Sequence, residues 1–144
     1  MHLQLRQATQ ADIPFLLALR RETMDQHLAA SGADTSEESH RTRVDYHFDC
    51  ASILMDDHQT PLGLLKVRRL PDHWDILQIQ LGGAWQGRGI GRSLIEDLIA
   101  DATAGGASLK LGVLKANPAR KLYERLGFEV IGEDAHEYFM LRLA

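Results

Sequence analysis

The sequence predicts an α/β fold, an α+β mixed sheet with helices packed on it, in the element order βααβββαβαββ. Short runs in which apolar and polar residues alternate recur along the chain, and such runs are typical of half-buried strands. Other stretches repeat apolar residues at helical spacing. The chain has 144 residues, 44% hydrophobic and 25% charged, which is the composition of one soluble domain over residues 1–144.

The first half of the chain is marked by alternating runs and by one helix start signal. Apolar and polar residues alternate over 3–8, which indicates a strand. Thr9 and Asp12 fit the capping box that begins a helix, and the helical spacing of apolar residues continues to Met24. The further elements expected here are a loop over 30–36, a polar helix over about 36–48, and strands over 51–56 and 62–70.

The second half contains a strand–helix–strand unit. A strand is expected over 75–81, followed by a glycine-rich turn and by a helix that Gly105 and Gly106 end. A strand over 108–114 comes next, and a right-handed crossover should place it parallel to the first. The closing elements expected are a short helix from Asn117-Pro118 to Gly127 and strands over 128–132 and 136–143.

Charge and cysteine content exclude several classes of protein. The 16 Lys and Arg residues against 20 Asp and Glu give a net charge of −4, so no nucleic-acid partner is expected. The single cysteine, Cys50, excludes an intramolecular disulfide framework, and no metal is expected. No apolar run approaches the roughly 18 to 20 residues of a membrane span. The N-terminus turns polar too early for a signal peptide, so no membrane partner and a cytoplasmic location are expected.

The glycine-rich turn Gln86-Gly87-Arg88-Gly89-Ile90-Gly91 predicts an anion site. Glycines let a backbone turn several N–H groups toward one point, and the helix that begins there adds unpaired N–H groups and the positive end of its dipole. Arg88 and Arg92 supply further cations, which suits a pyrophosphate. The turn lacks the last glycine of the dinucleotide fingerprint and the Walker lysine. From the glycines alone, a turn that merely connects strand to helix remains an equal alternative.

Two motifs in order resemble the GNAT superfamily of N-acyltransferases. Gln86-x-x-Gly89-x-Gly91 before an amphipathic helix is similar to its acetyl-CoA motif, and residues 117–128 resemble its second signature helix. The resemblance implies that the strands near 75–81 and 108–114 splay apart around the pantetheine arm of acetyl-CoA. The residues that it implies for acetyl-CoA binding are Ile79, Leu81, Gln86, Gly87, Arg88, Gly89, Ile90, Gly91, Arg92 and Asn117.

Acetyl transfer from a thioester to an amine requires a neutral amine and a stabilised leaving thiolate. Tyr123 holds the position at which many GNAT relatives present a phenol to the sulfur, which implies a general acid; packing of its ring is the alternative. Asp75 matches the position at which some relatives carry a base, and the alternation puts it on one face with Leu77, Ile79 and Leu81. A merely charged strand-entry residue, with a water chain as base, is the alternative.

No motif identifies the acceptor. The segment from Arg20 to Ser36 usually shapes acceptor choice in GNAT proteins, but its charges are mixed. His136 is expected either to line the acceptor pocket with Tyr138 or to face solvent. Cys50 is expected to be a buried small hydrophobe, and the histidine spacings specify no metal site.

The expected function is transfer of an acetyl group from acetyl-CoA directly to a primary amine of a small molecule or peptide. One alternative is a catalytically inactive GNAT module that binds acyl-CoA as a sensor or subunit. Another is a nucleotide-binding α/β domain that uses the same glycine turn. The sequence leaves the oligomeric state open, and a homodimer is one alternative, because GNAT proteins are commonly dimers.

Overall fold

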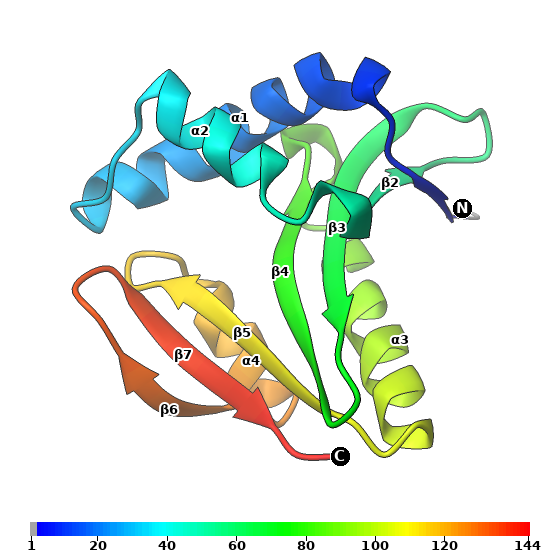
Figure 1. The fold of residues 1–144 in the computed structure, drawn as a ribbon, viewed down its shortest axis with the longest axis vertical. Helices are drawn as coiled ribbons and strands as arrows, with labels where there is room; N and C mark the ends of the chain where they lie inside the picture. The colour runs from blue at the N-terminus through cyan, green and yellow to red at the C-terminus, as the bar shows by residue number, and fades with distance from the viewer. Residues whose placement is uncertain (1–2) are drawn as a thin grey trace.

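The structure, a computed structural model, describes residues 3–144 and has the predicted order of helices and strands. The helices are α1 (Ile13–Ala30), α2 (Glu37–Asp45), α3 (Ile90–Ala104) and α4 (Ala119–Arg125). The strands are β1 (Gln4–Gln7), β2 (Ala51–Met55), β3 (Pro61–Arg69), β4 (His73–Leu81), β5 (Ser108–Leu114), β6 (Glu129–Glu133) and β7 (Glu137–Arg142). They form one sheet in the order β1-β2-β3-β4-β5-β7-β6 (Figure 1).

The sheet is mixed, as predicted. Its neighbouring strands pair antiparallel except β4 and β5, which pair parallel and are joined through α3. A parallel pair needs such a crossover, whereas antiparallel neighbours can be joined by short turns. Within residues 3–144, no helix is both long and apolar enough to cross a bilayer.

Each face of the sheet carries its own hydrophobic core. One core joins α3 and Tyr123 of α4 to residues such as Leu65 and Val67 of β3. The other joins α1 and α2 to the opposite face, where Ile53 and Leu64 lie. Successive residues of β3 therefore alternate between two buried faces, which explains why this strand is an almost continuous apolar run.

β4 and β5 pair along only part of their length. Their register begins at His73 opposite Ser108 and ends at Ile76 opposite Leu111, and beyond that point the strands diverge below α1 and α2 (Figure 1). A bulge coincides with the divergence, because Val67 of β3 pairs with Ile76 while the preceding residue pairs with Gln78. A bulge disrupts the ladder and bends and twists its strand. The predicted splay is confirmed.

The bulge also overturns the predicted position of Asp75. Asp75 pairs with Arg68 of β3, whereas Ile79 pairs with Leu65. Arg68 and Leu65 are three residues apart and so lie on opposite faces of β3. The prediction that Asp75 shares a face with Ile79 is therefore wrong. One extra residue shifts a strand's alternation by one position, and the sequence pattern alone does not reveal it.

Candidate active site

Two adjoining cavities occupy the opening between β4 and β5. The turn cavity, of about 420 Å³, is lined by the glycine-rich turn at the start of α3. The inner cavity, of about 230 Å³, is lined by α1, the end of α2, β4, β5 and the start of β7. Both are lined by Met24, Ile79, Gln80, Asn117 and Tyr123. Ligands in the two cavities would meet at this common wall.

The turn cavity has the geometry of an anion cradle. Gly87 and Gly89 have φ angles of +74° and +77°, a left-handed conformation that favours glycine. A Cβ atom built on either glycine meets nothing within 4 Å, so the space beside the turn is open. The side-chain amide nitrogen of Gln86 closes the turn by donating a hydrogen bond to the Leu81 carbonyl at 2.9 Å. The first N–H groups of α3, from Ile90 onward, border the same space.

The two arginines predicted beside this turn differ in position. Arg92 lines the turn cavity, and its Nε donates to Glu96 at 2.9 Å. Arg88 does not line it, because its guanidinium stacks 5.2 Å from the ring centroid of Trp85. This geometry therefore does not support the predicted role of Arg88 as a cation inside the site. Arg88 does lie in the glycine-rich turn, as expected.

The edge of β4 forms the floor of the opening. Ile79 and Leu81 line the turn cavity, and no strand among residues 3–144 pairs with the β5-facing edge of β4 beyond Ile76. This edge consequently leaves backbone donors and acceptors available to an extended ligand, as a sheet edge does for an added strand. Both residues lie on the strand that the sequence predicts, and their part in acetyl-CoA binding stays a prediction.

Asn117 and Tyr123 form the opposite side of the common wall. The side-chain oxygen of Asn117 accepts the N–H of Ala119 at 2.9 Å, which holds it at the first turn of α4 as predicted. The Tyr123 ring packs edge-on against Phe128, with 5.9 Å between centroids. Burial raises the pKa of Tyr123 to about 12, so the phenol is protonated at neutral pH.

The inner cavity depends on a clamp between the sheet and the end of α2. The Lys66 ammonium, almost fully buried in β3, donates to the carbonyls of Arg43, Val44 and Tyr46 at 3.1, 3.1 and 2.6 Å. Gln78 of β4 adds a bond of 3.0 Å to the Arg43 carbonyl. These bonds satisfy carbonyls that a helix leaves unpaired at its C-terminus. They also hold Arg43 at the cavity.

A second arginine enters the inner cavity from α1. Arg20 is only 5% exposed, and its Nε donates to Nδ1 of His40 at 3.0 Å. The other ring nitrogen of His40 lies 2.6 Å from a carboxylate oxygen of Asp25. Burial lowers the pKa of Arg20 to about 10, so the guanidinium is charged at neutral pH.

Glu137 is a site residue that the sequence analysis missed. It stands at the start of β7 and lines the inner cavity. Its carboxylate lies over Gly112 of β5, where a Cβ would collide with Oε2 of Glu137. Burial, together with the nearby Asp134 carboxylate, raises the pKa of Glu137. A glycine inside a strand often marks such a close approach, so Gly112 was the available signal.

Other residues considered in the sequence lie away from both cavities. Asp75 lines a separate hollow with Lys110 of β5, and one of its carboxylate oxygens is 3.5 Å from Nε2 of His73. Neither expectation for His136 is correct. It is half-buried outside the cavities, and its Nδ1 lies 2.8 Å from the Ser31 carbonyl oxygen. Tyr138 also lies outside the inner cavity, where Lys115 stacks on it.

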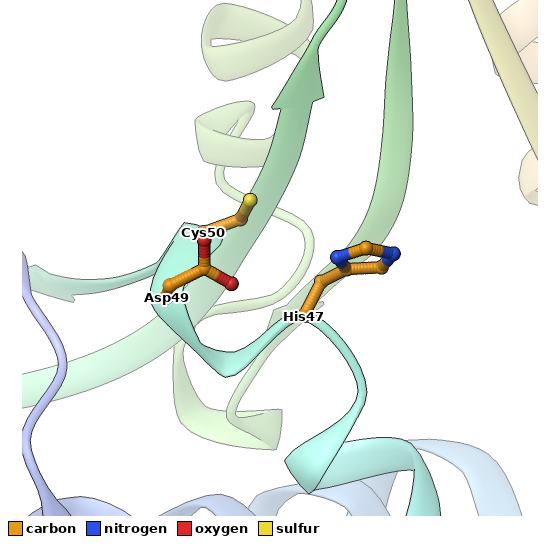
Figure 2. A group of neighbouring side chains, drawn as sticks. All are labelled: His47, Asp49 and Cys50. Atoms are coloured by element: carbon orange, nitrogen blue, oxygen red, sulfur yellow. The ribbon is translucent and has the colours of Figure 1, made fainter.

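Cys50 is half-buried, so the expectation of a buried hydrophobe is wrong. It lies beside His47 and Asp49, and the potential ligand atoms of the three side chains are all within 4.8 Å of one another (Figure 2). Imidazole nitrogen, carboxylate oxygen and thiolate sulfur are ligands that zinc accepts. None of the three lines either cavity, so this cluster is separate from the site described above.

Comparisons with known proteins agree with the fold. The PaiA N-acetyltransferase from Thermoplasma acidophilum, solved with coenzyme A, superposes with a TM-score of 0.76 and 17% identity over 100% of both chains. The N-acetylglutamate synthase from Neisseria gonorrhoeae, solved with coenzyme A and N-acetyl-glutamate, gives a TM-score of 0.70 and 21% identity over 99% of this chain and 35% of that one. A GCN5-related N-acetyltransferase from Kribbella flavida gives 0.68 and 25%, over 99% and 98%.

No individual curated protein sequence matches the chain. The sequence profile described as the Acetyltransferase (GNAT) family, in contrast, matches residues 16–128, which is most of the chain. This range contains both motifs on which the resemblance was based. The chain belongs to the GNAT family of acetyltransferases.

Proposed function

We propose that the protein transfers an acetyl group from acetyl-CoA to a primary amine. The observation that carries the proposal is the common wall, because Asn117 and Tyr123 border both the turn cavity and the inner cavity. A donor in one cavity and an acceptor in the other would meet there. Coenzyme A in the PaiA and N-acetylglutamate synthase structures supports acetyl-CoA as the donor.

The turn cavity fits the donor chemically. Acetyl-CoA carries an anionic diphosphate and an extended pantetheine arm that contains amides. The open cradle at Gly87 and Gly89, with the first N–H groups of α3, would hold the diphosphate. The unpaired edge of β4 at Ile79 and Leu81 would bind the amides of the arm.

Transfer at the common wall needs no covalent enzyme intermediate. The neutral amine nitrogen of the acceptor attacks the thioester carbonyl, the C–N bond forms, and the C–S bond breaks. Tyr123, which lines both cavities, would give its hydroxyl proton to the leaving thiolate as general acid. Burial raises the pKa of the phenol to about 12, so Tyr123 still holds its proton at neutral pH when the thiolate forms.

Two measurements test the proposal. Acetyl-CoA should raise the melting temperature, since a ligand at 100 times its Kd stabilises a native state by about 2.7 kcal/mol. A panel of amines, followed by release of free CoA thiol, should then show release that requires an amine. Millimolar acetyl-CoA without any melting shift contradicts the donor assignment, while binding without amine-dependent release favours the inactive module. Competition by ATP or NAD, but not by CoA, favours a nucleotide-binding domain.

A further inference from the structure

The inner cavity contains more positive than negative charge. Arg20 and Arg43 line it, and Glu137 is the only acidic residue among the described residues that do. Neither arginine forms an ion pair within residues 3–144, although several arginines on the outer surface do. The direct side-chain contact of Arg20 is His40, whose other ring nitrogen lies 2.6 Å from Asp25. That of Arg43 is the Tyr46 ring, with 4.9 Å from guanidinium carbon to ring centroid.

Such an arrangement is unusual for a buried surface. A cation removed from water needs an anionic or hydrogen-bonding partner, and guanidinium groups pair especially well with carboxylates. Arg20 is 5% exposed, and Gln78 and Gln80, at 7% and 5%, each have a side-chain oxygen without a donor. The cavity therefore presents two buried acceptor oxygens without a donor, which a donor group of a ligand, such as an ammonium, would satisfy.

The acid in the cavity is Glu137. Glu137 and Gly112 line the same cavity as Tyr123, and Gly112 leaves room for the Glu137 carboxylate. A carboxylate at this position can hold an ammonium group and accept its proton. The two arginines, from α1 and α2, then remain for an anionic group on the same ligand. They would repel a polyamine, which has only positive groups.

We infer that the acceptor is a small amine that also carries a carboxylate, an amino acid, with its ammonium at Glu137 and its carboxylate at Arg20 and Arg43. The inference rests on the acetyl transfer proposed above. A cavity of about 230 Å³ suits a small molecule, since pockets for drug-sized ligands begin at roughly 300 Å³.

Protons balance in the resulting reaction. The acceptor ammonium gives one proton to Glu137, and the neutral nitrogen attacks the thioester carbonyl. The nitrogen then loses its second surplus proton to solvent as the amide forms. The thiolate, released when the C–S bond breaks, takes a proton from Tyr123, which is reprotonated by solvent. Glu137 returns its proton to solvent before the next cycle.

The experiment measures binding and turnover separately. α- and ω-amino acids, each beside its carboxamide and its decarboxylated amine, and a diamine are titrated into the CoA-loaded protein. The same compounds are then assayed with acetyl-CoA for thiol release. The best amino acid should bind at least about tenfold more tightly than its carboxamide, because a charge-assisted pair is lost in the carboxamide. It should also be the better acceptor.

Three variants test which residues cause the preference for the amino acid over its carboxamide. Arg43→Gln should reduce the ratio between amino acid and carboxamide to within about threefold, since the charged hydrogen bonds are removed. Arg41→Gln is the matched control, because Arg41 lies on the same helix but pairs with Asp45 at 3.0 Å on the exposed surface. Arg41→Gln should keep the full ratio between the affinities for amino acid and carboxamide. Glu137→Gln should weaken amino acid and carboxamide alike, because both carry the ammonium.

The outcomes separate this inference from the proposed function. Equal or tighter binding of carboxamides or of the diamine overturns the inference, as does a panel in which no amino acid binds. Preferential binding of amino acids that Arg43→Gln abolishes supports it, even if thiol release never depends on them. In that last case the acetyl transfer fails while the ligand class stands.

Discussion

The turn cavity and the inner cavity are built from different kinds of sequence information. The turn cavity takes most of its wall from two short stretches, residues 79–95 and 117–123. The inner cavity combines Arg20 with Glu137, which are more than a hundred residues apart, and residues between them from five elements. A local motif can specify the surface proposed for the donor, whereas the surface proposed for the acceptor exists only after the sheet has assembled.

The largest expected effect is at the wall that the cavities share. Tyr123→Phe removes one hydroxyl and keeps the ring that packs on Phe128. If the phenol protonates the thiolate, kcat should fall by roughly 10² to 10⁴, about 2.7 to 5.4 kcal/mol of transition-state stabilisation. CoA affinity should change little, because the hydroxyl acts on charge that appears late in the reaction.

Steady-state kinetics with chemistry rate-limiting, beside a direct CoA titration, measure both quantities. With a pKa of about 12, Tyr123 keeps its proton below that pH, so it should cause no alkaline loss of activity near neutrality. A variant that retains more than about a third of wild-type kcat removes Tyr123 from the mechanism, because a positioned acid contributes more.

The next largest effect is expected on stability, from a substitution that should affect the inner cavity but not the turn cavity. Lys66→Met removes the ammonium from three carbonyls at the end of α2, of which, within residues 3–144, only that of Arg43 keeps another donor, Gln78. It should lower the free energy of unfolding by about 3 kcal/mol. The Arg43 carbonyl then keeps only its bond from Gln78, so KM for the acceptor should rise. CoA affinity should stay within about twofold, because none of the residues joined by these bonds lines the turn cavity. Denaturant titration, acceptor kinetics and CoA titration test this. Lys110→Met, at an exposed position of β5, is the control.

The features that the sequence predicts correctly are local, like the turn cavity, and those that it misses depend on distant residues, like the inner cavity. The element order, the glycine turn and the position of Asn117 were predictable, because capping residues, glycines and periodic apolar residues act over a few positions. The bulge between Ile76 and Gln78 was not, since one extra residue in a strand leaves the apolar alternation looking regular. Glu137 was missed because its meeting with Gly112 depends on the pairing of β5 with β7.

A smaller effect is expected for the turn cavity alone. Gly89→Val forces a β-branched residue into a φ of +77°, and the turn should relax and redirect its amides. Strain of about 1 to 3 kcal/mol is typical of such positions, so CoA affinity should fall by about tenfold or more. Gly106→Val is the control, because Gly106 has a φ of +69° and open space at the other end of α3. Both variants should lose stability, but only the first should lose affinity; equal CoA affinity in both means that the turn merely connects strand to helix.

The smallest effect is expected at Asp75, where sequence and structure disagree. Asp75→Asn removes a carboxylate that lies on the opposite face of β4 from Ile79 and lines a hollow separate from both cavities. Its kcat should stay within about threefold of wild type, because loss of a general base costs at least roughly 10². Glu137→Gln, assayed beside it on the same acceptor, should show the larger loss. A hundredfold fall in a folded Asp75→Asn variant, with Glu137→Gln near wild type, assigns the base to β4 and contradicts the role given to Glu137.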